Sequence, residues 1–184
     1  MALTARLSAW ALSLRRRWKS HLFTLALLVA VWAGVQAWQT RDVPSGPAPD
    51  FVLNLVQPDG SQVRTTLAQW RAEHPGQPVA LHVWAEWCPI CGAEENSVTR
   101  LSRDWPVLTI AMQSGHAEQV GRVLAQRQLP WTTAIDSRGE ISRQLGFKAV
   151  PAFVVVDAQG NLRSATVGYT SEIGMRLRLW WAGL

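Results

Sequence analysis

The chain contains two cysteines, Cys88 and Cys91, three residues apart. Residues at this spacing lie on one face of a helix, so the two sulfurs can meet. A helix is predicted from Cys88 to about Asp104, and Pro89 stands at its first position, where a missing N–H costs nothing. The free N–H groups and partial positive charge of a helix N-terminus stabilise a thiolate on Cys88. The spacing therefore predicts a redox pair in which Cys88 attacks a disulfide and Cys91 resolves the product.

Three other uses of a cysteine pair are alternatives. A zinc site needs two further ligands, and the histidines at 21, 74, 82 and 116 show no pairing at ligand spacing. A purely structural disulfide across a three-residue step would restrict the unfolded chain very little. Copper(I) binding remains open, because soft thiolate ligands suit that ion.

The elements that must position the pair alternate between strands and helices. Val79–Ala85, directly before the cysteines, is a mostly apolar run of strand length, as expected for a strand buried on both faces. Further strands are predicted at Phe51–Val56, Gln62–Thr65, Val107–Met112, Trp131–Ile135, Phe153–Asp157 and Leu162–Val167. Further helices are predicted at Thr66–Glu73 (with Thr66 as N-cap), His116–Gln128, Gly139–Leu145 and Ser171–Trp181. This order predicts an α/β domain with a mixed central sheet, in which the final hairpin supplies antiparallel strands.

The basic charge of the chain is concentrated near its N-terminus. The net charge is +5, but residues 1–41 carry six Arg or Lys and no acidic residue, which leaves 12 basic and 13 acidic residues in the remainder. The predicted domain is therefore nearly neutral. This argues against nucleic-acid binding, because phosphate contacts need clustered Lys and Arg.

Leu22–Trp38 is a run of 17 residues without charge. At about 1.5 Å per residue it gives roughly 25 Å of helix, at the short end for spanning a bilayer. Because four basic residues lie at 15–19, the sequence predicts a cytoplasmic basic segment (1–21), a transmembrane anchor (22–38) and export of everything after Trp38. The Val35-Gln36-Ala37 stretch also fits a signal-peptidase site, and an acid-free, Arg-rich N-terminus is shared with organelle transit peptides. The long uncharged run favours a retained anchor.

The residues after the anchor are rich in proline and glycine. Pro44, Gly46, Pro47 and Pro49 predict a linker over residues 39–50, followed by the folded domain at 51–184.

Two stretches some 60 residues apart carry a family resemblance. Residues 83–91 (VWAEWCPIC) resemble the thioredoxin active-site stretch, and residues 149–157 (AVPAFVVVD) are similar to the cis-proline strand of that family. Pro151 before an apparently central strand is otherwise hard to place. The resemblance implies a thioredoxin fold over about residues 48–184, a Pro151 turn that faces the cysteines, and a Val150 backbone that pairs with substrate peptide.

The anchor, the linker, an extra N-terminal β-hairpin and Glu94 together resemble the TlpA-like, membrane-tethered periplasmic oxidoreductases. Within these, CPICGAEENSV is similar to the suppressor-of-copper-sensitivity thioredoxin-like proteins. The resemblance implies a reductase in the bacterial inner membrane, protein clients with disulfides or thiols, a transmembrane thiol electron carrier and a link to copper tolerance. It implies no metal, and no cofactor beyond the redox-active Cys88–Cys91 disulfide. A disulfide-forming oxidase stays open, because Pro89 replaces the family glycine and the dipeptide tunes the potential.

His82 stands six residues before Cys88, where thioredoxins place a buried Asp that relays the proton of the resolving thiol. A histidine can act as a base near neutral pH, or it can be a neutral, hydrogen-bonded core residue. Glu94 and Glu95 are expected on the helix surface, and only the family implies a buried proton-relay role for Glu94.

The residues around the cysteines are expected to contact the client. Trp87 is expected to shield the disulfide and to offer an apolar docking face, and Pro89 and Ile90 are predicted to bind substrate together with Val150. The proline at 151 argues against copper(I), because it would crowd a third ligand.

Overall fold

The computed structural model describes residues 2–184, with side chains from Trp18 onward, and the chain divides into two units, Met1–Trp38 and Gln39–Leu184. One helix, α1 (Ala2–Gln39), forms the first unit and reaches the first residue of the second. Its Trp18–Gln39 part is long and apolar enough to cross a membrane, with a mean hydropathy of 1.6. A signal sequence near an N-terminus would meet the same criterion.

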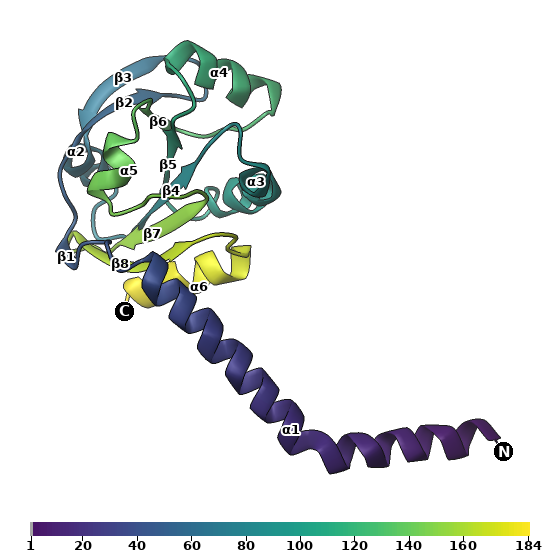
Figure 1. Cartoon of the computed structure of the whole chain (residues 1–184). Coiled ribbons are helices and arrows are strands. Elements are labelled where there is room, and N and C mark those ends of the chain that lie inside the picture. The colour runs from purple at the N-terminus through teal and green to yellow at the C-terminus, as the bar shows by residue number, and fades with distance from the viewer. Residues whose placement is uncertain (1) are drawn as a thin grey trace. The chain divides into compact units, whose positions relative to one another are not determined.

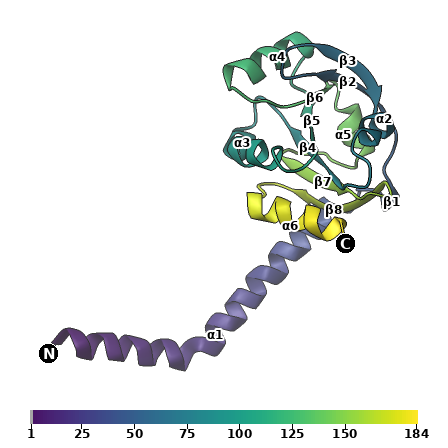
Figure 2. The same cartoon turned by 180° about the vertical axis from the view of Figure 1, so that it is seen from behind.

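The second unit is built on an eight-stranded mixed sheet with helices on both faces (Figures 1 and 2). The strand order across the sheet is β1-β8-β7-β4-β5-β6-β2-β3. The strands are β1 (Gly46–Pro47), β2 (Val52–Val56), β3 (Gln62–Thr66), β4 (Val79–Trp84), β5 (Val107–Met112), β6 (Thr133–Asp136), β7 (Ala152–Val156) and β8 (Asn161–Val167). The helices are α2 (Leu67–Ala72), α3 (Pro89–Leu101), α4 (Ala117–Gln126), α5 (Glu140–Gln144) and α6 (Glu172–Ala182).

The strand that leads to the cysteines lies near the middle of the sheet. β4 pairs in parallel with β5 and antiparallel with β7, and all six of its residues are buried. Successive side chains of a strand point to opposite faces. Leu81 and Val83 therefore join the core cluster beneath α2 and α5, while Trp84 joins the cluster beneath α3 and α6. The predicted apolar strand and the mixed α/β sheet are confirmed.

The predicted N-terminal hairpin is present. β2 and β3 pair antiparallel, and β2 extends the sheet by pairing with β6. Thr66 caps α2 as predicted, in a reciprocal capping box with Gln69. The helix predicted from Cys88 to Asp104 ends earlier, at Leu101, because its last buried residue lies there and the chain then turns toward β5.

The structure differs from the predicted linker over residues 39–50. Gly46 and Pro47 form β1, which pairs with the edge of β8. The Asp42 carboxylate forms an ion pair with Lys148 at 2.7 Å. The backbone of Asp42 also lies so close to Gly146 that any side chain at position 146 would collide with it. Most of the predicted linker therefore packs on the domain. The proline-rich composition gave no signal for a strand, because β1 is held by two residues of backbone pairing and not by an apolar pattern.

Asp157 closes the hairpin between β7 and β8. Its carboxylate accepts the backbone N–H of Asn161 at 2.8 Å and the Nε–H of Arg163 at 2.9 Å, and its side chain is 4% exposed. Burial alone would raise the pKa of Asp157, but these hydrogen bonds and the Arg163 charge outweigh it and hold the pKa below the ordinary value of 3.8.

We predict that Asp157→Ala lowers the free energy of unfolding at pH 7 by about 1–2 kcal/mol, because it removes the buried acceptor of the half-buried Asn161 N–H and of Arg163. Since the folded-state pKa lies below the unfolded one, the carboxylate contributes fully above about pH 4, and the contribution is lost as pH falls through the folded pKa. Urea denaturation should therefore show the gap between wild type and variant narrowing toward pH 2–3. A gap of the same size at pH 7 and pH 2.5 would contradict this account.

Candidate active site

The two cysteines lie at the junction of β4 and α3, and the structure joins them in a disulfide with 5.3 Å between their Cα atoms. Cys88 is the N-cap of α3, with extended backbone (φ −94°, ψ 108°), and its Sγ accepts the backbone N–H of Cys91 at 3.2 Å. Pro89 occupies the first turn, as predicted. The helix thus aims a backbone donor at the sulfur of Cys88, which is the arrangement that stabilises a thiolate.

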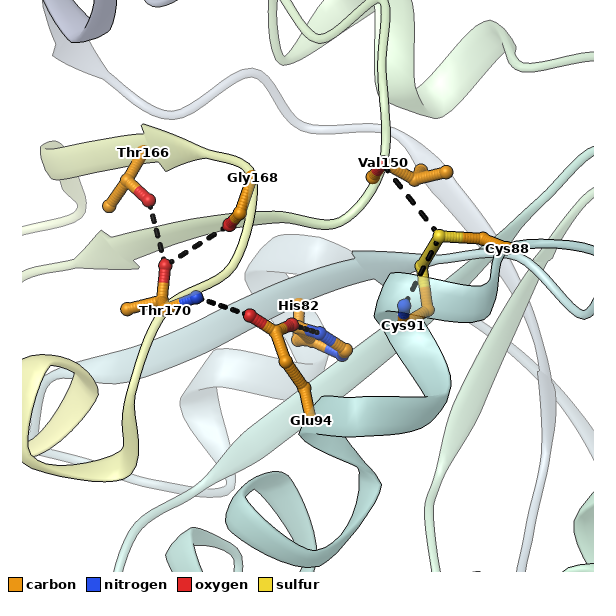
Figure 3. A network of polar contacts seen from close by, with 8 residues as sticks. All are labelled: His82, Cys88, Cys91, Glu94, Val150, Thr166, Gly168 and Thr170. Carbon is orange, nitrogen blue, oxygen red and sulfur yellow. Dashed lines mark hydrogen bonds and ion pairs between the residues drawn. A yellow bond between two sulfur atoms is a disulfide. The ribbon is translucent and has the colours of Figure 1, made fainter. Parts of the chain in front are cut away.

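The loop before β7 lies directly opposite the cysteines (Figure 3). The Val150–Pro151 peptide bond is cis, as the resemblance implied, and the Val150 carbonyl oxygen lies 3.8 Å from Cys88 Sγ. The Pro151 carbonyl accepts the N–H of Gly168 at 2.8 Å, which ties this loop to the end of β8. Val150 itself is half-buried, and its carbonyl faces the more accessible sulfur.

Large apolar side chains surround the disulfide at the surface. Trp87 is 57% exposed and Ile90 is 52% exposed, while Cys88 is only 6% exposed. The indole Nε1–H of Trp87 donates to the Gln113 carbonyl at 3.1 Å, so the ring is held in place although it is exposed. Tyr169, which sequence reasoning missed, is 58% exposed and follows Gly168 of the loop that pairs with Pro151.

A buried polar network lies beneath the cysteines (Figure 3). His82 Nε2 and Glu94 Oε2 are 3.0 Å apart, and both side chains are 1% exposed. The other carboxylate oxygen of Glu94 accepts the backbone N–H of Thr170, whose hydroxyl is within hydrogen-bonding distance of Thr166. The network therefore links β4, α3 and the loop before α6.

The burial of Glu94 corrects one expectation from the sequence. Glu95 does lie on the helix surface, 21% exposed and paired with Arg127 at 2.7 Å, but Glu94 is buried. The helical position of Glu94 carries no signal for this, because its partners come from β4 and from a backbone N–H far along the chain. Thr170 could not be found from its side chain, because its N–H makes the contact.

The hydrogen-bond partners of the buried pair fit one arrangement of its protons. Glu94 accepts a backbone N–H on one oxygen, so the carboxylate form fits if His82 donates its Nε2–H to the other. Among the residues that the structure describes, none offers a hydrogen-bond partner to His82 Nδ1. This nitrogen is an acceptor when His82 is neutral, and the pair then carries one negative charge beneath the disulfide.

A paired-cysteine helix start, a facing cis-proline loop and a central mixed sheet define a thiol–disulfide oxidoreductase of thioredoxin fold. Comparison with known proteins agrees with this class. The chain belongs to the Redoxin family, whose model matches residues 44–175.

Several relatives carry names of the same chemistry. The chain is 30% identical over 151 residues to the thiol:disulfide interchange protein DsbE of Allochromatium vinosum, an alignment that covers 78% of this chain and 79% of that protein. It is 27% identical over 107 residues to a thioredoxin-like protein of Haemophilus influenzae, covering 58% of this chain and 64% of that protein. These names support protein-disulfide oxidoreductase activity for this chain.

Solved structures confirm the fold. The exposed lipoprotein thioredoxin Etrx1 of Streptococcus pneumoniae superposes with a TM-score of 0.60 at 20% identity, covering 72% of this chain and 99% of that one. A thiol:disulfide interchange protein of the thioredoxin family from Chlorobium tepidum gives 0.59 at 21% identity, covering 78% and 99%. At these identities the likeness shows the fold alone.

We predict that Glu94→Gln destabilises the oxidised chain by about 1–3 kcal/mol, because the amide keeps only one acceptor oxygen and leaves one buried N–H donor, of Thr170 or of His82, without a partner. Glu95→Gln is the matched control, since it alters the neighbouring carboxylate in a partly exposed pair and should cost under about 1 kcal/mol. Chemical denaturation of both variants measures the difference. Equal losses would show that the His82–Glu94 contact contributes no more than a surface pair.

Proposed function

We propose that this chain is a membrane-tethered periplasmic reductase of protein disulfides. The observation that supports it best is the position of Cys88 Sγ, which accepts the Cys91 N–H at 3.2 Å and lies 3.8 Å from the carbonyl of Val150. A backbone donor on one side favours the thiolate, and a free backbone edge on the other can pair with an extended client segment.

The proposed reaction moves two electrons from the reduced pair to the client. The Cys88 thiolate attacks a client disulfide, forms a mixed disulfide and releases one client thiolate. Cys91 then loses its proton and attacks the Cys88 sulfur, which releases the second client thiolate and restores the Cys88–Cys91 disulfide. A transmembrane thiol carrier then returns two electrons and two protons to the two cysteines, so the proposed cycle uses no resident cofactor beyond the Cys88–Cys91 disulfide.

The His82–Glu94 pair is our candidate acceptor for the proton of Cys91. Glu94 follows Cys91 by one helical turn, so both side chains lie on the same buried face of α3. His82 Nδ1 has a lone pair that no described residue occupies, and the Nε2 contact with Glu94 stabilises the imidazolium that protonation would form. Cys91 is 2% exposed, so water has little direct access to its thiol.

The charge of this pair also supports the direction of electron flow. A negative charge on Glu94 disfavours a second negative charge on a nearby sulfur. The reduced form of the two cysteines is then less stabilised than in a strongly oxidising protein. This favours donation of electrons from Cys88 and Cys91 to a client. The disulfide-forming oxidase and the copper(I)-binding module remain predictions from the sequence alone.

Client binding is assigned to the surface around Cys88. Val150 offers its backbone, and Trp87, Pro89 and Ile90 present exposed apolar area beside the disulfide. Apolar, rigid side chains of this kind gain affinity at little entropic cost. The expected clients are proteins with disulfides or thiols in an oxidising compartment, where a dedicated reductant is needed.

The tethering rests on the Trp18–Gln39 helix segment. Basic residues at 15–19 precede its apolar core, so we place the N-terminus in the cytoplasm and the domain in the periplasm of a bacterium. Trp18 and Trp38 at the two ends suit the two membrane interfaces.

We predict that a Cys91→Ser chain expressed in a bacterial envelope accumulates mixed disulfides with clients, because the resolving thiol is gone. Non-reducing gels should show high-mass species that disappear when dithiothreitol reduces the mixed disulfides. The matched Cys88→Ser chain should give none, since the accessible sulfur would be lost. Equal trapping by both variants would contradict the assignment of Cys88 as the nucleophile.

We also predict a reduction potential near or below roughly −230 mV for the Cys88–Cys91 pair, measured by equilibration with glutathione or dithiothreitol. Glu94→Gln should raise this potential by removing the buried charge, and Glu95→Gln should leave it almost unchanged. A wild-type value above about −150 mV would place the protein among the oxidants instead.

A further inference from the structure

The outer face of the C-terminal helix is entirely apolar. The exposed residues of α6 are Ile173, Leu177, Trp180 and Trp181, with exposed fractions of 72%, 58%, 59% and 75%. With 3.6 residues per turn, these four positions fall within an arc of about 100°. The side of α6 that is usually polar in a surface helix therefore forms one apolar stripe. We call these four residues the α6 stripe.

The opposite side of α6 is fully used by the domain. Met175 and Leu179 are completely buried in the core beneath α3 and α6. Arg176 is paired with Asp104 at 2.8 Å and with Glu172 at 3.0 Å, so its charge is directed along the flank of the helix. The stripe is therefore extra apolar surface that the fold does not need for its own core.

The composition of the stripe suits a lipid surface. Adjacent tryptophans are typical of the membrane interface, where the ring sits at the headgroup level and the indole N–H stays in contact with water. An apolar helix stripe flanked by arginines can lie in the plane of that interface, and here the packed domain takes the place of the polar face. Leu184 follows the stripe at 86% exposure and extends it to the end of the described chain.

The chain enters the domain at the end of the sheet that carries α6; Val43 packs on the face covered by α2 and α5, and α6 packs on the opposite face. β1 pairs with β8, and α6 packs against β7 and β8, so both lie at one end of the sheet, away from α4 and β3 (Figures 1 and 2). Only two residues separate the end of α1 at Gln39 from Asp42, which is held to the domain by Lys148. At about 3.5 Å per residue, this connection reaches roughly 10 Å.

We propose that α6 docks on the surface of the bilayer that holds α1, with the α6 stripe inserted among the lipid headgroups. This inference rests on the membrane anchoring proposed above. With α1 in the bilayer, the short connection keeps the headgroup layer and the apolar interior beneath it beside this edge of the domain.

The test uses the full oxidised chain labelled with 5-fluorotryptophan, with one chain in each nanodisc of phosphatidylethanolamine and phosphatidylglycerol. A gadolinium chelate on a fraction of the headgroups broadens the fluorine signals of nearby tryptophans. Trp180→Phe and Trp181→Phe assign the two signals. We expect their broadening to be several-fold greater than that of Trp87, which is 57% exposed but lies beside the cysteines.

A paired variant separates docking from mere closeness to the anchor. Ile173→Gln with Leu177→Gln should reduce the broadening of Trp180 and Trp181 several-fold, because it removes apolar contact without touching the core. Val52→Gln with Val63→Gln, at exposed positions of β2 and β3, should leave it unchanged. No effect of the α6 change, or equal broadening of Trp87 and the two α6 tryptophans, would overturn the proposal.

The same spectra distinguish failure of docking from failure of anchoring. Strong broadening of Trp18 and Trp38 shows that α1 is in the disc whatever α6 does. The two α6 signals could instead broaden only in nanodiscs that hold several chains. In that case the α6 stripe binds a second copy of the chain, and the proposed docking on the bilayer is wrong.

Discussion

The hydrogen bond from the Cys91 N–H to the sulfur of Cys88 is the contact on which the rest of the site depends. It requires α3 to begin at Cys88, directly after the central strand β4, so that the helix N-terminus opens at the carboxyl end of that strand. Neighbouring β7 then brings the Val150–Pro151 loop over the same sulfur, because β4 and β7 pair antiparallel and the end of one meets the start of the other. The paired cysteines and the facing Val150 backbone are thus brought together by the start of α3 and by the antiparallel pairing of β4 and β7.

Burying the His82–Glu94 pair between a strand and a helix carries a large desolvation cost. Two charges or near-charges taken out of water cost several kcal/mol, and apolar side chains of similar volume are often at least as stable. The backbone N–H of Thr170 donates a hydrogen bond to the Glu94 carboxylate and so offsets part of this desolvation cost. Such a buried ionisable pair beneath a reactive disulfide is in keeping with the proton-accepting role proposed above.

Much of this architecture could be predicted from the sequence. The features that could not be predicted have one cause in common. The strand Val79–Trp84, the start of α3 and the N-cap Thr66 follow from apolar runs and from local chemistry. The cis bond before Pro151 followed from family resemblance and not from local pattern. β1, the burial of Glu94 and the role of the Thr170 N–H all depend on partners distant in the chain, and no local periodicity reports such contacts. The sequence predicts a helix at Ser171–Trp181, but only the structure separates its exposed apolar residues from the buried residues Met175 and Leu179.

If α1 spans a bilayer, as proposed, the short connection between α1 and Asp42 limits which molecules this domain can meet. A domain of this size is about 40 Å across, so with α1 in a bilayer the cysteines sweep only a thin layer above it. Partners that diffuse in the same bilayer share that layer, and confinement to two dimensions raises their effective concentration far above that of dissolved proteins. The tether would therefore favour reaction with membrane-bound donors and clients. The domain would encounter them more often than dissolved proteins, whatever side chains they present.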